Sequence, residues 1–478
     1  VKKIDEVVVV GYGTQKKTEV TSAISSVKEE DFNKGAITSS PIQLIQGKVA
    51  GLAVSRSNGG DPASGVQMQL RGVSTVSGTA TPLVIIDGIP GGSLNTVAPE
   101  DIASIDVLRD GSAAAIYGTR GTNGVILITT KKGKAGKARI EYSGYSYFDE
   151  YSNKPSVLSG EDWRQLKIDF AHGTNVYLKG KVATMSDFGH NTDWFKEISQ
   201  TKLSSVHNLS MSGGNEHIDY YAAVNYRDLN GLIKESYNNF INSRLKLGHT
   251  SANKKLRTDM SFSYTVQKYR PTDYSVFYKA LQRNPTLPVY NPDGTFAEQT
   301  GFDNFNPVAL LKQRDYEVQR SEILTNLRVT YELFKGLKFS TMLALQRSNQ
   351  QEGQYLHRNS WQSITGGLKG EASRAERQSA DRTYESTLDY HTAFGNNNNH
   401  ELTALLGYTY QDFTNEGFGA SNRDFISDDL SFNNLNAGQG LRNGLYRDRD
   451  VWSEKNTSTL AAFFGRLTYH IREKYIFS

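Results

Sequence analysis

The chain has 478 residues and a formal net charge of +4, with 54 Lys and Arg against 50 Asp and Glu. This small charge argues against a nucleic-acid-binding surface, and the length predicts two or more folding units. The absence of cysteine excludes disulfides, thiolate metal sites and cysteine nucleophiles. Mean hydropathy is −0.52, and no apolar run approaches the roughly 18 residues of a membrane helix. A membrane β-barrel stays compatible, because its strands alternate apolar and polar side chains.

The chain opens with a strand-forming segment within residues 1–13, which ends in a Gly-Tyr-Gly break. A strand isolated near a terminus has free backbone groups, so the edge of another protein's sheet can capture it. An ordinary buried strand is the alternative. A dinucleotide-binding turn is excluded, because Lys16 occupies the third glycine position. The candidate partner-binding residues are Asp5, Glu6, Val7, Val8, Val9 and Val10.

Residues 14–135 mix short strands with short helices, which predicts a compact α+β domain. Ser40 before Pro41 predicts a helix start, and residues 112–117 predict an Ala-rich helix that ends at Gly118. Gly-rich turns separate the predicted strands, which are 52–55, 66–70, 83–86, 105–108 and 125–129.

Residues 136–478 carry long strands with a period of two. In 259–267, for example, Met260, Phe262 and Tyr264 share one face, while the other face is polar. Short polar turns alternate with long loops, expected near 153–203, 271–320, 348–380 and 414–457. Short turns on one side and long loops on the other are the plan of an outer-membrane barrel. A soluble sandwich or solenoid explains the alternation but not this asymmetry.

The size of the first domain predicts how large the barrel is. A domain of this size does not fit inside about ten strands, whereas roughly 22-stranded transporters hold a plugged lumen. The residues Tyr475-Ile476-Phe477-Ser478 begin a further strand, and an open sheet edge cannot face lipid. We therefore expect an α+β plug followed by an antiparallel transmembrane β-barrel, of which residues 136–478 supply about ten of roughly 22 strands.

Four motifs stand out in the first part of the chain: the long stretch 108–133, Leu70-Arg71-Gly72, Ile86-Asp87-Gly88 and the segment 4–13. The first three resemble the plug motifs, and the fourth the TonB box, of SusC/RagA-type TonB-dependent outer-membrane transporters. Arg-Gly-Thr-Asn-Gly at 120–124 resembles the SusC branch. The signature residues are Arg71, Gly72, Asp87, Gly88, Arg109, Asp110, Tyr117, Gly118, Arg120, Gly121, Asn123 and Gly124.

This resemblance implies energy-coupled import of oligosaccharides or peptides across the outer membrane of a Gram-negative cell. It implies TonB as the partner of residues 5–10, a SusD-like surface lipoprotein over the barrel mouth, and outer-membrane lipid around the barrel. The alternatives are a single-component TonB-dependent receptor for another nutrient and a non-energised surface-binding barrel protein. No cofactor, metal, nucleic acid or enzymatic activity is expected, because the nine histidines lack metal-ligand spacing and hydrolase motifs are missing.

Charged plug residues and loop aromatics complete the candidate sites. Arg71, Arg109, Asp110 and Arg120 are expected to pair with charges on the barrel wall in a structural role, with simple solvation and a direct role in gating as the alternatives. The Gly/Ser/Thr-rich segments 57–65 and 74–81 are expected to face the substrate. Loop side chains suited to stacking on sugars, to bonding peptides or to docking a protein are Tyr274, Phe277, Tyr278, Phe302, Phe305, Arg423, Phe425, Tyr446 and Arg447.

Overall fold

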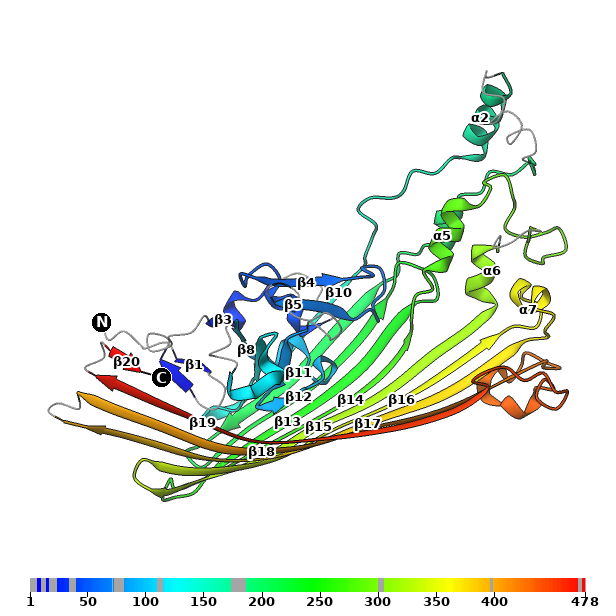
Figure 1. Cartoon of the computed structure of the whole chain (residues 1–478). Helices are drawn as coiled ribbons and strands as arrows, with labels where there is room; N and C mark the ends of the chain where they lie inside the picture. The colour runs from blue at the N-terminus through cyan, green and yellow to red at the C-terminus, as the bar shows by residue number, and fades with distance from the viewer. Residues whose placement is uncertain are drawn as a thin grey trace.

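The computed structural model divides into a small domain and one large curved sheet (Figure 1). The small domain lies against the concave face of the sheet. None of the described helices is long and apolar enough to cross a membrane. The described residues are 7–9, 14–16, 24–33, 40–70, 72, 81–109, 115–172, 186–299, 305–395, 399–471 and 475–477.

The N-terminal valines form a hairpin strand. β1 (Val7–Val9) pairs antiparallel with β2 (Thr14–Lys16), with Val8 opposite Gln15. The expectation of an isolated strand is therefore wrong in this respect. The glycines at 11 and 13 lie between the two strands in sequence, and glycine favours chain reversal. The two strands form a sheet of their own, so β1 keeps a second edge without a partner strand among the described residues.

The small domain is built on a five-stranded sheet with the order β3-β8-β9-β6-β7. β6 and β9 run parallel, and the other neighbouring pairs are antiparallel. A separate hairpin joins β4 to β5. The strands are β3 (Ile24–Lys28), β4 (Leu52–Arg56), β5 (Val66–Leu70), β6 (Leu83–Ile86), β7 (Ile89–Pro90), β8 (Ile102–Leu108) and β9 (Val125–Thr130).

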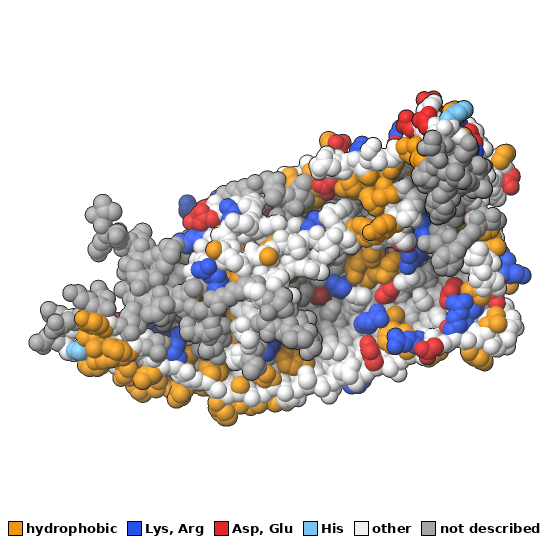
Figure 2. Space-filling view, turned by 45° about the horizontal axis from the view of Figure 1, so that its top comes forward, with side chains coloured by type: hydrophobic (Ala, Val, Ile, Leu, Met, Phe, Trp, Pro, Cys, Tyr) orange, Lys and Arg blue, Asp and Glu red, His pale blue; other side chains and the backbone are white. Residues whose placement is uncertain are grey.

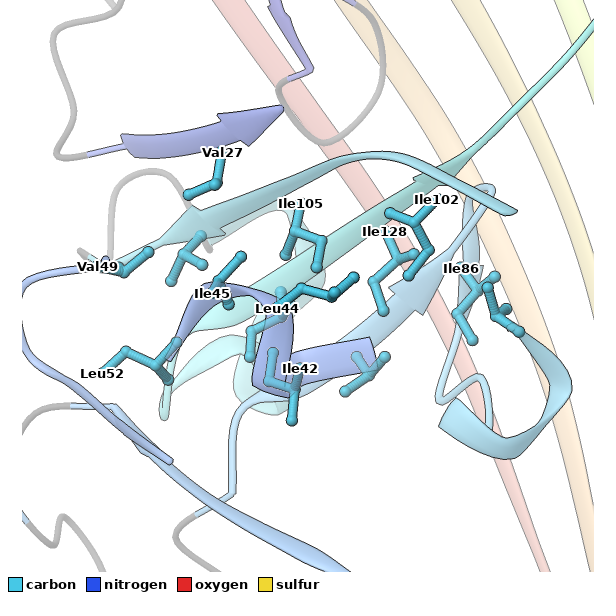
Figure 3. Packing of buried hydrophobic residues seen from close by; sticks show 14 of the residues in the cluster. Val27, Ile42, Leu44, Ile45, Val49, Leu52, Ile86, Ile102, Ile105 and Ile128 are labelled. Carbon is cyan, nitrogen blue, oxygen red and sulfur yellow. The ribbon is translucent and has the colours of Figure 1, made fainter. Parts of the chain in front are cut away.

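The core of this domain lies between the sheet and the short 3-10 helix η3 (Pro41–Ile45) (Figure 3). Ser40 precedes the helix as expected, and its backbone N–H donates to Gln43 Oε1 at 3.1 Å. Leu324, Met342 and Ala344 of the large sheet close the same apolar cluster. The domain therefore packs its core directly onto the wall.

The predicted helix at 112–117 is replaced by the 3-10 helix η6 (Ala115–Gly121), and residues 112–114 lie outside the described part of the chain. Gly118 does not end the helix. It breaks the helical geometry in the middle, with φ 60° and ψ −147°. Glycine tolerates this left-handed backbone, so the segment bends at Gly118 and continues to Gly121.

The large sheet is an antiparallel meander of eleven strands among the described residues. Each strand pairs with its neighbour in sequence, as expected for a barrel wall. The strands are β10 (Gly136–Tyr147), β11 (Ser204–Gly214), β12 (Ile218–Asn230), β13 (Tyr237–Thr250), β14 (Leu256–Arg270), β15 (Arg314–Phe334), β16 (Leu337–Leu356), β17 (Glu371–Phe394), β18 (His400–Arg423), β19 (Val451–Ile471) and β20 (Tyr475–Phe477).

The two faces of this wall differ in polarity. On β14, outward Met260, Phe262 and Tyr264 are 36–41% exposed, whereas inward Ser263 and Thr265 are 2% exposed. Hydrophobic side chains gather along the convex lower edge of the molecule (Figure 2). An apolar outer face with a polar inner face is the pattern of a transmembrane barrel strand.

The strands extend much farther than the sequence pattern indicated. Residues 314–320, 348–356, 371–380, 414–423 and 451–457 were expected in long loops, but they belong to β15, β16, β17, β18 and β19. Their outward residues, such as Gln351 and Arg374, are as polar as their inward ones, so the period of two disappears. The loops at this end of the sheet carry five helices among the described residues (Figure 1). They are α2 (Gly160–His172) and α4 (Trp194–Ile198) between β10 and β11, α5 (Ser275–Gln282) and α6 (Pro307–Lys312) between β14 and β15, and α7 (Trp361–Thr365) between β16 and β17.

Candidate functional site

Asp87 makes the strongest charged contact between the small domain and the wall. With Gly88 it forms the two-residue turn from β6 to β7, and both residues have positive φ, 50° and 86°. Such a hairpin turn favours Asp-Gly. The Asp87 carboxylate accepts from Arg244 Nη2 and from Lys246 Nζ, each at 2.8 Å. It also accepts from the Thr130 hydroxyl at 2.7 Å and its backbone N–H at 3.0 Å.

The charge of Asp87 is stabilised inside this contact. Its side chain is 9% exposed and that of Arg244 is 2% exposed. Burial by itself raises the pKa of Asp87, but Lys246 and Arg244 outweigh burial and hold the pKa below its usual value. The turn therefore presents an ionised carboxylate to two cations of β13.

Gly88 suits the positive φ of the turn, and a larger residue there would also displace an arginine of the wall. A Cβ at this position would lie 2.8 Å from Nη2 of Arg328 on β15. That nitrogen also lies 3.0 Å from the sulfur of Met342 and 3.9 Å from a carboxylate oxygen of Glu385. The glycine thus admits the arginine to the space between the small domain and the wall.

A second contact comes from the 3-10 helix η5 (Pro99–Asp101), where two acidic residues face β12. The buried Asp101 carboxylate accepts from Tyr221 Oη at 2.8 Å and from Asn225 Nδ2 at 3.0 Å. Glu100 pairs with Arg227, which is 1% exposed. Burial raises the pKa of Asp101.

A third contact is made by η4 (Leu94–Thr96) and the residue before it. The carbonyl oxygen of Thr96 accepts hydrogen bonds from Asn242 Nδ2 at 3.1 Å and from Ser263 Oγ at 2.6 Å. The hydroxyl of Ser93 donates to the Glu322 carboxylate at 3.2 Å. All of these donors and acceptors are polar groups that water could satisfy instead.

Of the charged residues expected to pair with the wall, Arg120 lies against it and interacts electrostatically with Asp381 of β17, whereas Arg109 bonds within the small domain. Arg120 reaches β18, but it donates to the amide oxygen of Gln411 and lies 5.4 Å from the Phe413 ring centroid. Arg109 donates to the Ala50 carbonyl at 3.2 Å, inside the small domain. Thus neither hydrogen bond goes to a wall carboxylate. The candidates Arg71, Asp110, Asp5, Glu6 and Val10 lie outside the described residues.

The remaining signature residues shape the small domain around these contacts. Gly124 has φ 86°, and a Cβ there would lie 2.2 Å from Cδ2 of Leu70 and 3.0 Å from the Leu108 carbonyl oxygen. The Gly121 carbonyl accepts from the Gly124 N–H at 2.9 Å. Gly72 is exposed, Tyr117 and Asn123 are half-buried, and burial raises the pKa of Tyr117.

Two cavities border the small domain and the wall. One has a volume of about 330 Å³ and is lined by Asp87, Tyr117, Lys132, Lys246 and Arg328, among others. The other has a volume of about 660 Å³, with Ser64, Asn95, Arg120, Asn123, Asn238 and Gln267 in its lining. The second cavity has mixed polar and apolar walls and is large enough to hold water, whereas Ile85, Leu127, Ile128 and Met260 make much of the first one apolar. The interface combines hydrogen bonds and ion pairs with space for solvent.

The long outer loops are built around buried anchors. Arg423 and Phe425, expected as presented side chains, are 1% and 3% exposed. Arg423 Nη1 donates to Asp450 Oδ2 at 2.9 Å, and Phe425 packs edge-on against Tyr355 with centroids 5.3 Å apart. Tyr278 and Tyr446 are exposed at 66% and 74%. Phe302 lies outside the described residues.

Comparison with known proteins agrees with this architecture. The family described as TonB-dependent Receptor Plug Domain matches residues 16–125. The chain is 32% identical over 487 residues to TonB-dependent receptor P3 of Formosa agariphila, covering 100% of this chain and 46% of that protein. It is 28% identical over 513 residues to TonB-dependent receptor SusC of Bacteroides thetaiotaomicron, covering 99% of this chain and 48% of that protein.

The chain is SusC-like, with a TonB-dependent receptor plug domain. It spans about half the length of the curated relatives that it matches. The RagAB peptide importer in the open-open state superposes with a TM-score of 0.82 at 24% identity, over 98% of this chain and 55% of that chain. The unliganded ferric citrate transporter FecA gives 0.54 at 14% identity, over 95% and 55%. These two likenesses establish the fold: the small domain is a plug and the large sheet is barrel wall.

Sequence reasoning missed the main plug–wall contacts. Asp87 was selected as part of a motif, but its two cationic partners were not, and Glu100 and Asp101 were not selected at all. The available signal was weak: Arg244 and Lys246 fall on the polar period of β13, as many lumen residues do.

Proposed function

We propose that the protein carrying this chain is an outer-membrane importer, energised by TonB, that takes up oligosaccharides or peptides together with a SusD-like lipoprotein. The observation that carries the proposal is the nature of the plug's attachment. Ion pairs and hydrogen bonds join the plug to the wall around Asp87 and Asp101, and a cavity lies beside Asp87. Water can replace such contacts, which suits a plug that must be displaced during transport.

The energy input is proposed to enter at β1. A two-stranded sheet leaves β1 an edge on which a strand of TonB can add through backbone hydrogen bonds. Asp5, Glu6 and Val10 flank this strand in sequence and complete the proposed TonB-binding segment, with residues 1–13 as box and hinge and 14–135 as plug. A pull on this segment is transmitted along the chain to the plug.

The partner and the substrate class are proposed from the outer loops and the relatives. Exposed apolar side chains beyond the wall suit a protein partner, because exposed aromatics are common interface anchors. They are Tyr278, Tyr290, Ile426, Leu430 and Tyr446, between 50% and 75% exposed. RagAB, whose fold matches, is a peptide importer, which supports polar oligomers as cargo. No chemical step on the cargo is proposed.

The energy coupling is tested by replacing Val8 with Pro in the whole receptor. Proline removes a backbone donor and cannot take part fully in an added strand, so uptake of the native nutrient should fall to the level of a strain lacking TonB. Surface binding of the nutrient and outer-membrane insertion should persist. The matched control is Val8→Thr, which keeps a β-branched strand residue and should transport normally. Wild-type uptake by the Val8→Pro variant would refute energised import through β1.

The partner is tested separately by gentle purification from the native outer membrane. A stoichiometric surface lipoprotein should accompany the receptor, and deletion of its gene should reduce uptake. Recovery of the receptor alone, with uptake intact after that deletion, would favour a single-component receptor instead.

A further inference from the structure

The inner face of the wall carries a row of polar and aromatic side chains above the plug, on the part of β14–β19 that extends beyond the apolar band. Strand register places Arg320, Gln350 and Arg377 directly across from one another on β15, β16 and β17. The next register row contains Tyr269, Glu352 and Trp452. We name these six residues the vestibule strip. Charged side chains line the hollow beside the plug (Figure 2).

The cationic end of the strip is Arg320. Its Nε donates to Gln350 Oε1 at 3.1 Å, its Nη2 donates to Tyr269 Oη at 3.3 Å, and its guanidinium lies 5.7 Å from the Tyr269 ring centroid. The hydrogen bonds of Arg320 within the described part of the chain thus go to neutral groups. Glu322, the next inward residue on the same strand, accepts from Ser93 of the plug. A guanidinium held by neutral partners is prepared for a carboxylate.

The aromatic end of the strip is Trp452. It lies against two glycines of β18: a Cβ at Gly419 would come within 2.5 Å of the indole nitrogen, and one at Gly417 within 3.3 Å of the ring. The Arg377 guanidinium lies 5.0 Å from the Trp452 ring centroid. The absence of side chains at the two glycines gives the indole a flat seat on the wall. A flat, fixed aromatic ring is a stacking platform.

The middle of the strip is already charge-balanced. Glu352 pairs with Arg377 at 3.4 Å and accepts from Tyr316 Oη at 3.0 Å and from Gln354 Nε2 at 2.8 Å. Glu454 of β19 lies in the same register row as Arg320, Gln350 and Arg377, four strands away from Arg320. At the β15 end, Arg320 interacts electrostatically with Glu322, but the described residues form no ion pair with its guanidinium.

The dimensions of the strip indicate an extended ligand. Neighbouring strands are about 4.8 Å apart, so the five strands β15–β19 span on the order of 20 Å. Val318, the aliphatic residue between Tyr269 and Glu352 in the register, is 2% exposed. The strip thus offers one amide, two guanidinium groups, a phenol, a carboxylate and an indole. Val318 is buried, so it gives an apolar peptide side chain no accessible aliphatic surface.

We propose that the vestibule strip binds a carboxylate-bearing oligosaccharide, with a uronate carboxylate on Arg320 and a sugar ring on Trp452. This rests on the proposed import function and narrows its substrate class. Gln350 and Arg377 lie between the two ends and hydrogen-bond ring hydroxyl groups. Binding takes place on the wall and precedes any movement of the plug.

The test measures binding to the purified whole receptor, which requires no TonB. The probes are tetramers of galacturonate, mannuronate and guluronate, each compared with its carboxyl-reduced neutral counterpart, and tetraglutamate as an acidic peptide. At least one oligouronate should bind, and Arg320→Gln should raise its Kd at least tenfold without changing the Kd of the neutral counterpart. Trp452→Ala should weaken both ligands.

The matched control is Arg374→Gln, which removes a cation at the same height of β17 but from the opposite, exposed face. It should leave all affinities unchanged. A heat-modifiable gel shift confirms that each variant is folded. Equal affinity of Arg320→Gln and wild type, no oligouronate binding, or Arg320-dependent binding of tetraglutamate instead would overturn the proposal. Since Val8→Pro tests uptake and Arg320→Gln tests binding, either proposal can fail while the other stands.

Discussion

The ion pairs of Asp87 are predicted to hold the plug against the wall, and Asp87→Asn isolates their charge. Asn has nearly the same shape and tolerates the positive φ of 50° found at this position. The substitution leaves Arg244 and Lys246, 2% and 16% exposed, without their carboxylate. Removing one partner of a buried pair costs about 3–5 kcal/mol. We expect about 3 kcal/mol, the lower limit, because the Asn oxygen still accepts one hydrogen bond.

This loss is measured as local opening of the plug in the whole receptor. When opening is fast relative to cleavage, the rate of proteolysis follows the population of the open form, so about 3 kcal/mol corresponds to an increase on the order of 100-fold. Asp412→Asn is the control, because its partner Arg382 is exposed and Asp412 itself is only half-buried, so the pair contributes at most about 1 kcal/mol. Adding Lys246→Met to Asp87→Asn should recover part of the loss. A cleavage rate for Asp87→Asn no higher than that of Asp412→Asn would refute the reasoning.

Two further predictions concern Gly88 in the plug and His357 in an outer loop. Gly88→Ala places a Cβ 2.8 Å from Arg328 at a positive φ, so plug cleavage should rise at least tenfold, and ion conductance through the receptor in planar bilayers should increase. The hydrogen bond between His357 and Asp315 raises the pKa of His357. The contribution of that pair to outer-loop stability is complete below about pH 6.5 and is lost as pH rises through the higher folded pKa. Amide exchange around His357 should therefore increase with pH beyond the intrinsic rate, and His357→Gln should abolish this extra dependence; an unchanged profile in the variant would contradict the assignment.

The parts of the fold that follow a local pattern could be predicted from the sequence. Strand β14 alternates apolar and polar residues over 259–267, and the two faces of this part are exposed and buried as expected. The Asp-Gly turn at Asp87 was recognisable because its backbone conformation is a property of those two residues. Chain reversal between β1 and β2 depends on pairing across a turn, which the valine run alone does not specify.

Other features depend on partners that are distant in sequence. Asp101 bonds Tyr221, which is 120 residues away, so only the docked plug identifies it as a contact residue. The outer ends of β16 and β17 were taken for loops because both of their faces carry polar side chains. Their sequences therefore show no alternation of apolar and polar residues. The same absence of pattern concealed Arg320 and Trp452, which are brought together by strand register.

Cross-linking between β1 and TonB is the most direct test of energised import by this receptor. The chain contains no cysteine, so single cysteines at Val7, Val8 and Val9 can be paired one at a time with cysteines in TonB. Strand addition predicts disulfides in a period-two register, with residues 7 and 9 trapping one set of TonB positions and residue 8 another. Cross-links should increase when nutrient is bound. No cross-link from β1, with nutrient uptake by the cysteine variants intact, would contradict the account.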